Sequence, residues 1–315
     1  MKQVKSSQIS IVIQGQTQSC TQTVVDSART YFPEAEIILS TWAGSNIEIT
    51  GYDALVLSKD PGDPTPKNYR PPNLTRQIVS TQAGLLRATR NLAIKTRTDL
   101  EFTHGNIFDY FYQYPIREHE YILTNHRVIV SNITTFKPNK FFNIPYAICD
   151  FIHAGKTADL MKIFSAPSQS VEDLSWFLEK PKPNALSYFP GWIARFSPET
   201  WLTLNLVKQK FDIDLIDSFT KPSSVTQALA EKIMVTNFIV LNIKQLGVKS
   251  NKYRLPLPYF CFCYSHRDWL NLYTNQRLKL NFLFDHENFY RYAMLARFYL
   301  KSIIKKFLRA KKSGL

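Results

Sequence analysis

The chain has 315 residues, of which 44% are hydrophobic and 14% aromatic, and it carries a formal net charge of +14. It can therefore bury a large core, either as one α/β domain or as a domain with an appended subdomain. No run of 18 apolar residues occurs, which excludes a helix that spans a bilayer. The cysteines are too few and too scattered for a disulfide scaffold, and they indicate buried, reduced thiols in a cytosolic protein: Cys20, Cys149, Cys261 and Cys263.

The first 60 residues predict the beginning of a doubly wound sheet. The β-branched run at 9–13 is typical of a central parallel strand, and it is too short for the core of a signal peptide. A polar turn with Gln14 and Gly15 follows that strand. Residues 21–31 then predict a helix, and residues 36–40 and 52–58 predict two further strands.

A proline-rich loop and the helix after it form the most informative stretch. Residues 60–72 hold five of the 17 prolines and predict an irregular loop at the carboxyl end of a strand, where ligands of α/β proteins gather. Residues 76–90 predict an amphipathic helix, and 92–98 a buried strand that ends at Asp99. Polar groups at a helix start and an acid at a strand end suit a nucleotide diphosphate, because the helix supplies backbone donors and the acid can hold a metal or a ribose.

After residue 99 the predicted strands and helices alternate less regularly. Short strands are predicted at 121–124 and 127–131, helices at 157–164, 170–179, 197–211 and 227–246, and an extended edge segment at 254–264. We therefore expect an α/β fold with a mixed, mainly parallel sheet flanked by helices. Its parts are a nucleotide-sugar-binding core at 1–165, a mainly helical acceptor-side portion at 166–288, and a basic amphipathic helix at 289–315.

Four stretches in chain order carry a family resemblance. They are Ile-Val-Ile-Gln-Gly at 11–15, Asn-x-x-Arg-Gln-x-x-x-Thr-x-x-Gly-Leu at 73–85, Lys-Thr-Arg-Thr-Asp at 95–99, and the run from Ile144-Pro145-Tyr146 through Asp150-Phe151 and Gly155 to Asp159-Leu160. The run Asn-Phe-Ile-Val at 237–240 adds to them. Together they cover most of 9–250 and resemble the WavE family of lipopolysaccharide synthesis proteins.

The resemblance implies a nucleotide-sugar-dependent glycosyltransferase of the GT-A type, in bacteria. It would act from the cytoplasmic surface of the inner membrane on lipopolysaccharide core, a lipid-linked glycan or a related surface glycan. The residues expected to bind the nucleotide sugar are Gln14, Gly15, Asp60, Asn73, Arg76, Gln77, Lys95, Arg97 and Asp99.

A divalent cation, Mn²⁺ or Mg²⁺, is the cofactor that this resemblance implies, with Asp99 as its ligand. GT-A enzymes usually bind the metal with a strand-end Asp-x-Asp, whereas this chain has Arg97-Thr98-Asp99. Arg97 could neutralise the diphosphate directly, as arginine does in many phosphate sites. The alternative is an ordinary strand-end ion pair between Arg97 and Asp99.

Asp150 is the first candidate for the carboxylate that deprotonates the acceptor hydroxyl, with Glu172 and Asp173 behind it. The alternative for Asp150 is a helix N-cap. Asn73 could likewise cap its helix, leaving Arg76 and Gln77 in solvent, and Asp60 could serve only its turn.

The C-terminal helix has an apolar row beside a basic row. The apolar row is Ala296, Leu300, Ile303, Ile304 and Phe307, and the cations expected at an anionic membrane are Arg297, Lys301, Lys305, Lys306 and Arg309. Such a helix could instead dock on the domain or bind nucleic acid. The rival function is accordingly a membrane- or nucleic-acid-binding protein without chemistry. Because the 43 aromatic residues are scattered, nucleic acid is not the partner that we expect.

Overall fold

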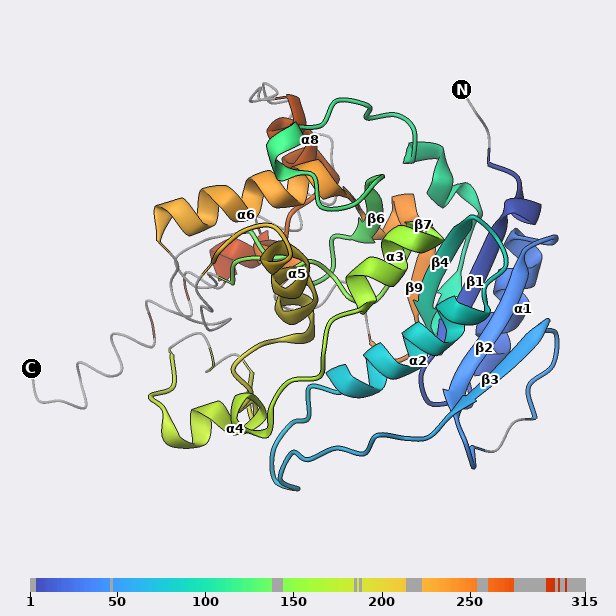
Figure 1. Cartoon of the computed structure of the whole chain (residues 1–315), viewed down its shortest axis with the longest axis horizontal. Helices are drawn as coiled ribbons and strands as arrows, with labels where there is room; N and C mark the ends of the chain where they lie inside the picture. Colours follow the sequence, from blue (N-terminus) through green and yellow to red (C-terminus); the bar gives the residue numbers. More distant parts are fainter. Residues whose placement is uncertain are drawn as a thin grey trace, which may run out of the picture.

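The computed structural model describes residues 4–45, 48–137, 144–183, 186, 189–213, 223–253, 260–274, 293–297, 300 and 304. In them a seven-stranded sheet has the order β3-β2-β1-β4-β7-β6-β8 (Figure 1). Its strands are β1 (Ile9–Gln14), β2 (Glu36–Trp42), β3 (Ala54–Ser58), β4 (Leu92–Arg97), β6 (Val128–Ser131), β7 (His153–Lys156) and β8 (Phe238–Leu241).

The sheet is mixed and mainly parallel, as predicted. The strand β7 pairs antiparallel with both β4 and β6, and the other neighbouring strands of this sheet pair parallel. The chain moves outwards from β1 to β3 and then returns to β4 on the other side of β1. Right-handed crossovers therefore place α1 (Thr21–Tyr31) on one face and α2 (Leu74–Arg87) on the other. This reversal makes the carboxyl ends of β1 and β4 the place where a ligand is expected.

Helix α2 lies close against the sheet because it has a glycine at its point of contact. A Cβ atom on Gly84 would lie 2.3 Å from Cγ1 of Val12 in β1 and 3.1 Å from Cβ of Ser40 in β2. Every residue of β1 is buried, and α3 (Thr157–Phe164) packs beside α2 over β4 and β7. The start of α2 is thereby held firmly at the carboxyl edge of the sheet.

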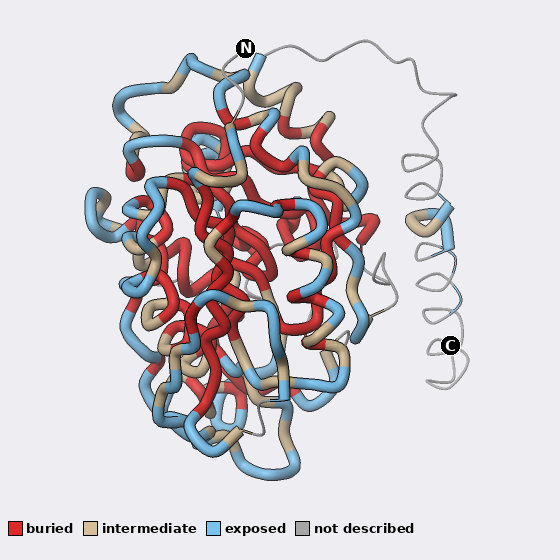
Figure 2. The backbone as a smooth tube through the Cα atoms, turned by 90° about the vertical axis from the view of Figure 1, so that its right-hand side faces the viewer, coloured by how far each residue is buried: buried red, intermediate tan, exposed pale blue. Residues whose placement is uncertain are grey.

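The remaining helices lie towards the β6–β8 side. They are α4 (Val171–Glu179), α5 (Pro198–Lys208), α6 (Ser224–Asn237), α7 (Ile243–Leu246) and α8 (His266–Thr274). A two-stranded ladder joins β5 (Leu100–Phe102) to β9 (Val248–Ser250). Buried residues fill the sheet layers, with the exposed ones outside (Figure 2). None of the four cysteines is in a disulfide, and three of them are buried.

Two sequence predictions were wrong. Residues 121–124 form no strand: a 3-10 turn, His119–Tyr121, is followed by irregular chain. The predicted helix at 227–246 ends at Asn237, and β8 and α7 follow it. The Asn237 side chain accounts for both, since it accepts from the main-chain N–H of Leu123 at 2.7 Å and donates to the carbonyl of Tyr121 at 2.8 Å.

The prediction for 254–264 falls partly outside the described residues, and its described end is a 3-10 turn, Phe260–Phe262. Helix α8 begins soon afterwards, at His266. The division into three parts stays a prediction, although β8 joins the sheet from the portion predicted to be mainly helical. No helix in the described ranges is both long and apolar enough to cross a membrane.

Candidate functional site

A cavity of about 420 Å³ lies at the carboxyl ends of β1 and β4. The chain after β1, the loop at 70–73, the first turn of α2 and the end of β4 form one side. Thr134, Asp150 and the first turn of α5 form the other, and Tyr253 after β9 lies between. Segments separated by up to 240 residues thus meet where the strand order reverses.

Arg97 and Asp99 form a closed ion pair at the end of β4. Nε and Nη2 of Arg97 donate to the two carboxylate oxygens of Asp99 at 2.8 and 2.6 Å. The Asp99 side chain is only 1% exposed. Arg97 and Asp99 thus form the strand-end ion pair that was the alternative prediction. The pair is bidentate and its carboxylate is buried, unlike the weak pairs on protein surfaces.

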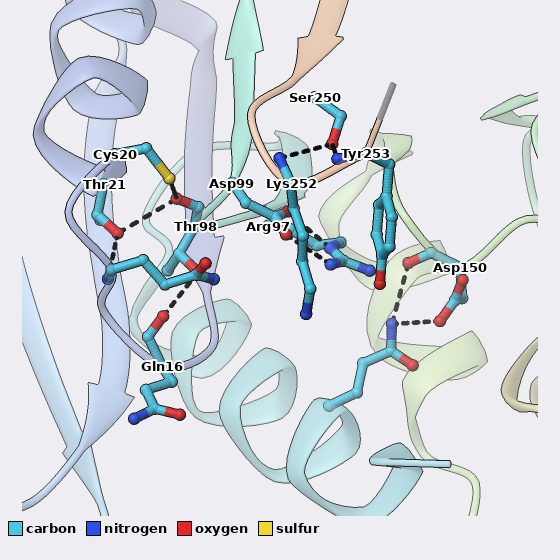
Figure 3. Close-up of polar contacts among 12 residues, drawn as sticks. Gln16, Cys20, Thr21, Arg97, Thr98, Asp99, Asp150, Ser250, Lys252 and Tyr253 are labelled. Carbon is cyan, nitrogen blue, oxygen red and sulfur yellow. Dashed lines mark hydrogen bonds and ion pairs between the residues drawn. The ribbon is translucent and has the colours of Figure 1, made fainter. Parts of the chain in front are cut away.

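The Arg97 guanidinium also lies against two aromatic rings that stack on each other. Its Cζ lies 4.5 Å from the ring centroid of Phe151 and 5.6 Å from that of Tyr253, and the two rings are inclined by 22°. Figure 3 shows the guanidinium next to Asp99, with the Tyr253 ring on its other side in this view. Burial alone would lower the pKa of Arg97, but its bonds to Asp99 outweigh that effect and raise the pKa above its ordinary value. The guanidinium therefore stays protonated at the cavity wall, with its charge balanced by Asp99.

The start of α2 presents uncapped backbone donors. Asn73 occupies the N-cap position with a φ of 54°, and its side chain makes no capping bond, so the capping alternative was wrong. Arg76 instead pairs with Asp60 through two bonds of 2.8 Å. The pair joins the proline-rich loop to α2 and fixes how the loop leaves β3.

Asp150 lies three residues before His153, the first residue of β7, so it is not a helix N-cap, and it lines the cavity. Its Oδ2 accepts from Nε2 of Gln77 at 2.8 Å, whereas its buried Oδ1 has no partner in the described part of the chain. Gln77 also donates to the Asp150 carbonyl at 3.0 Å, and Lys95 donates to that same carbonyl. Gln77 thus fixes the carboxylate and, together with Lys95, the main chain of Asp150, which leaves one carboxylate oxygen unpaired.

Lys95 lies beneath the cavity and is absent from its lining. It is fully buried in β4 beside His153 of β7, and its Nζ is 5.2 Å from the ring centroid of Phe164. Burial lowers the pKa of Lys95 to about 8, and the charge of Asp150 offsets this only in part. Burial together with the charge of Lys95 lowers the pKa of His153 well below its ordinary value, which keeps that imidazole neutral.

Glu199, in the first turn of α5, is a second carboxylate on the Asp150 side that the sequence prediction missed. Burial raises the pKa of Glu199 to about 7, and the negative charge of Asp150 acts in the same direction. Ser197 caps this helix by accepting from the main-chain N–H of Thr200 at 3.3 Å. The sequence Ser-Pro-Glu at 197–199 indicates only that a helix begins there. The packing of α5 on α3 is what brings Glu199 to the cavity. Two carboxylates near one another, one with a raised pKa, can accept and return a proton.

A second depression adjoins the first along the ends of β1, β2 and β3. Its lining and that of the main cavity share four residues, Gln16, Gln18, Trp42 and Arg76. The two are therefore continuous, with the Trp42 ring between them. Their combined length suits an extended ligand with an aromatic end.

The residues at the end of β4 do not fit the expected divalent cation. Both oxygens of Asp99 are bound by Arg97, which stands where a second acid is needed. Nowhere in the described ranges do three His, Cys, Asp or Glu side chains gather as a metal-binding group. The donor set that a hard cation requires is thus not offered here.

The family model described as WavE lipopolysaccharide synthesis matches residues 9–312. The chain belongs to the WavE family. Its role therefore lies in lipopolysaccharide synthesis. A search of curated proteins finds no match.

Most of the residues predicted to bind the donor in this WavE protein meet at the cavity. Gln14, Gly15, Asn73, Arg76, Gln77, Arg97, Asp99 and Asp150 line it, and Asp60 lines the adjoining depression. Gln77 and Gln14 are turned to protein partners, since the Gln14 amide oxygen accepts from the Ser80 hydroxyl at 2.7 Å. Glu172 and Asp173 lie on α4 and do not line the cavity. The roles of these residues in donor binding stay predictions.

The WavE protein's predicted membrane helix falls mostly outside the described residues. Lys301, Lys305, Lys306 and Arg309 lie there, whereas Arg297 is exposed in a helical segment, 293–297. Met294 and Leu295 of that segment pack against the cluster that contains Trp192. Farther along, Leu300 and Ile304 are 61% and 56% exposed. Two apolar side chains, four residues apart, thus face outwards.

Proposed function

We propose that this WavE protein is a glycosyltransferase that moves a sugar from a nucleotide donor to lipopolysaccharide core or a related cell-surface glycan. One observation carries the proposal: the cavity has a fixed cation and an open helix start on one side and two carboxylates on the other. The sheet order, mainly parallel with one antiparallel strand, supports a GT-A type of fold.

The donor lies along the ends of β1 and β4. Its nucleoside occupies the depression beside Trp42, and its diphosphate lies between the uncapped start of α2 and Arg97. A helix N-terminus and a guanidinium both favour phosphate oxygens, the first through backbone N–H groups and the second through its forked donors. The sugar then points towards Asp150 and Glu199.

In the transfer step the acceptor oxygen forms a bond to the anomeric carbon of the sugar. The bond from that carbon to the diphosphate breaks, and the diphosphate leaves with the electron pair, next to Arg97. The proton of the acceptor hydroxyl passes to a carboxylate. Asp150 offers its unpaired Oδ1 for this proton, and Glu199, whose pKa is about 7, exchanges it with water near neutral pH.

The acceptor's lipid anchor agrees with a membrane-surface enzyme. We place the segment 289–315 on the cytoplasmic face of the inner membrane, with Leu300 and Ile304 towards the lipid and its cations at the headgroups. Each basic residue near an anionic surface adds about 1 kcal/mol of attraction.

The test is a transfer assay with labelled UDP-, GDP-, CMP- and dTDP-sugars and rough lipopolysaccharide as acceptor. Wild type should label the acceptor with one donor class, and D150N should lower the rate by roughly 10² to 10⁴. D150N keeps the size of the side chain and the acceptor for Gln77, so the fold is retained. E172Q, at an exposed carboxylate outside the cavity, is the matched control. A folded wild type that neither binds nor transfers any of these sugars would refute the proposal.

A further inference from the structure

The end of β4 carries a fixed cation at the position where a metal would be needed. Two acids at 97 and 99 would hold a divalent cation between them, but the first of these residues is Arg97. Both oxygens of Asp99 already accept from Arg97, and the main-chain carbonyl of Asp99 accepts from the N–H of Asn251 at 2.9 Å. A metal would have to break two charge-assisted bonds and remain beside a guanidinium, so it is disfavoured twice.

The Arg97 side chain is built to remain in place. Asp99 holds one edge of its guanidinium, and the stacked rings of Phe151 and Tyr253 lie against it. These contacts come from β4, from the segment before β7 and from the chain after β9, so three separate parts of the fold fix one group. A charged group held in this way loses little side-chain entropy when it binds an anion.

One edge of Arg97 remains for a ligand. The guanidinium has five N–H donors, of which the bonds to Asp99 use one on Nε and one on Nη2. Its Nη1 group makes no hydrogen bond within the described ranges, and its side chain retains 20% exposure at the cavity wall. The free edge matches two oxygens of a phosphate group.

Two further cations line the same cavity. Lys252 is exposed next to Tyr253, and Arg70 is exposed at the loop before α2. Neither has an ion pair with an acid of the described chain, whereas Arg76 is neutralised by Asp60. Lys252 and Arg70 therefore add the net positive charge that a diphosphate requires without a metal, and Arg97, whose charge Asp99 balances, adds the N–H donors of its free edge.

We propose that this protein binds the diphosphate of its donor without a divalent cation, and that Arg97, fixed by Asp99, Phe151 and Tyr253, replaces the metal. Lys252, at the same cavity, supplies positive charge for the diphosphate. This inference rests on the proposed function, because it assigns a ligand class, a nucleoside diphosphate, to the same cavity.

Titration calorimetry of the full-length protein with UDP, GDP, CDP, ADP and dTDP tests the inference, in EDTA and again with Mn²⁺ or Mg²⁺. We expect one nucleotide class to bind with the same Kd, within about twofold, in all three conditions. K252A should weaken binding about tenfold in each of them, as the loss of one charge-assisted bond predicts. K244A, an exposed lysine of α7 outside the cavity, should leave Kd unchanged.

R97K is the second variant, because lysine keeps the charge but lacks the fork that Asp99 and a phosphate share. It should weaken binding about tenfold to a hundredfold with or without metal. A Kd that falls more than about tenfold on adding Mn²⁺ or Mg²⁺ to wild type would overturn the inference and leave the glycosyltransferase proposal standing. An unchanged Kd in both K252A and R97K would also overturn it. No binding of any nucleotide in any condition would refute both proposals.

Discussion

Replacing Lys95 with methionine should remove one specific part of the pH dependence of stability. Lys95 is fully buried in β4, and its pKa is about 8 instead of 10.5. Between these values the unfolded chain holds a proton that the folded protein has released. Stability therefore rises with pH across this window, in total by about 3 kcal/mol, and Lys95 contributes no slope below pH 8.

The assay is urea unfolding of wild type, K95M and the surface control K244M, followed by circular dichroism at pH 7.5 and 9.5. Buried groups with raised pKa values, such as Cys149 and Tyr146, lower the stability of all three proteins at high pH. The informative quantity is thus the stability of wild type minus that of K95M. It should grow by about 2 kcal/mol between the two pH values, whereas the corresponding difference for K244M should not.

A wild-type minus K95M difference that stays constant within about 0.5 kcal/mol would refute the reasoning. It would mean that Lys95 keeps its proton throughout, held by the Asp150 carbonyl and the negative charges above it. The cavity floor would then be cationic near neutral pH and above.

Three further outcomes are expected. G84A should destabilise the protein by about 1 to 3 kcal/mol in urea unfolding, because its Cβ would lie 2.3 Å from Val12; a loss below about 0.5 kcal/mol would show that α2 can move off the sheet. The kcat/KM of transfer should rise with pH through about 7 as Glu199 loses its proton, and E199Q should remove that limb; a limb that persists would assign it to another group. Changing Arg297, Lys301, Lys305 and Arg309 to glutamine should weaken binding to anionic vesicles by about 4 kcal/mol at low salt, and unchanged sedimentation with the vesicles would contradict a membrane role for this helix.

The strands and helices whose apolar residues recur with one clear period could be predicted from the sequence. The helices at 21–31 and 157–164 were predicted with the bounds that the structure has, since their apolar spacing and end signals agree. Strand β7 was missed because His-Ala-Gly-Lys looks like a turn, and only its position between β4 and β6 makes it a strand. The apolar run of β8 fitted a helix as well as a strand, and pairing with β6 decides between them.

The candidate site was predictable where it lies next to a local signal. The start of α2 and the end of β4 carry such signals, so Asn73, Arg97 and Asp99 were found. Glu199 and Tyr253 were not, because each sits in an ordinary local context and reaches the cavity through long-range packing. Lys95 was expected to touch the donor, yet it is fully buried in β4 and donates to the Asp150 carbonyl, a depth that its local sequence does not reveal.

The late position of the last strand in the sequence also determines how long its neighbour stays unpaired during synthesis. Strand β8 completes the edge beside β6, although it follows β6 by more than 100 residues. At a translation rate of about 5 to 20 residues per second, β6 waits roughly 5 to 20 s for its partner. Throughout that interval an apolar strand, Val128–Ser131, has an open edge on the ribosome, where another chain can pair with it. The nascent chain therefore depends on whatever shields that edge until Leu241 has been made.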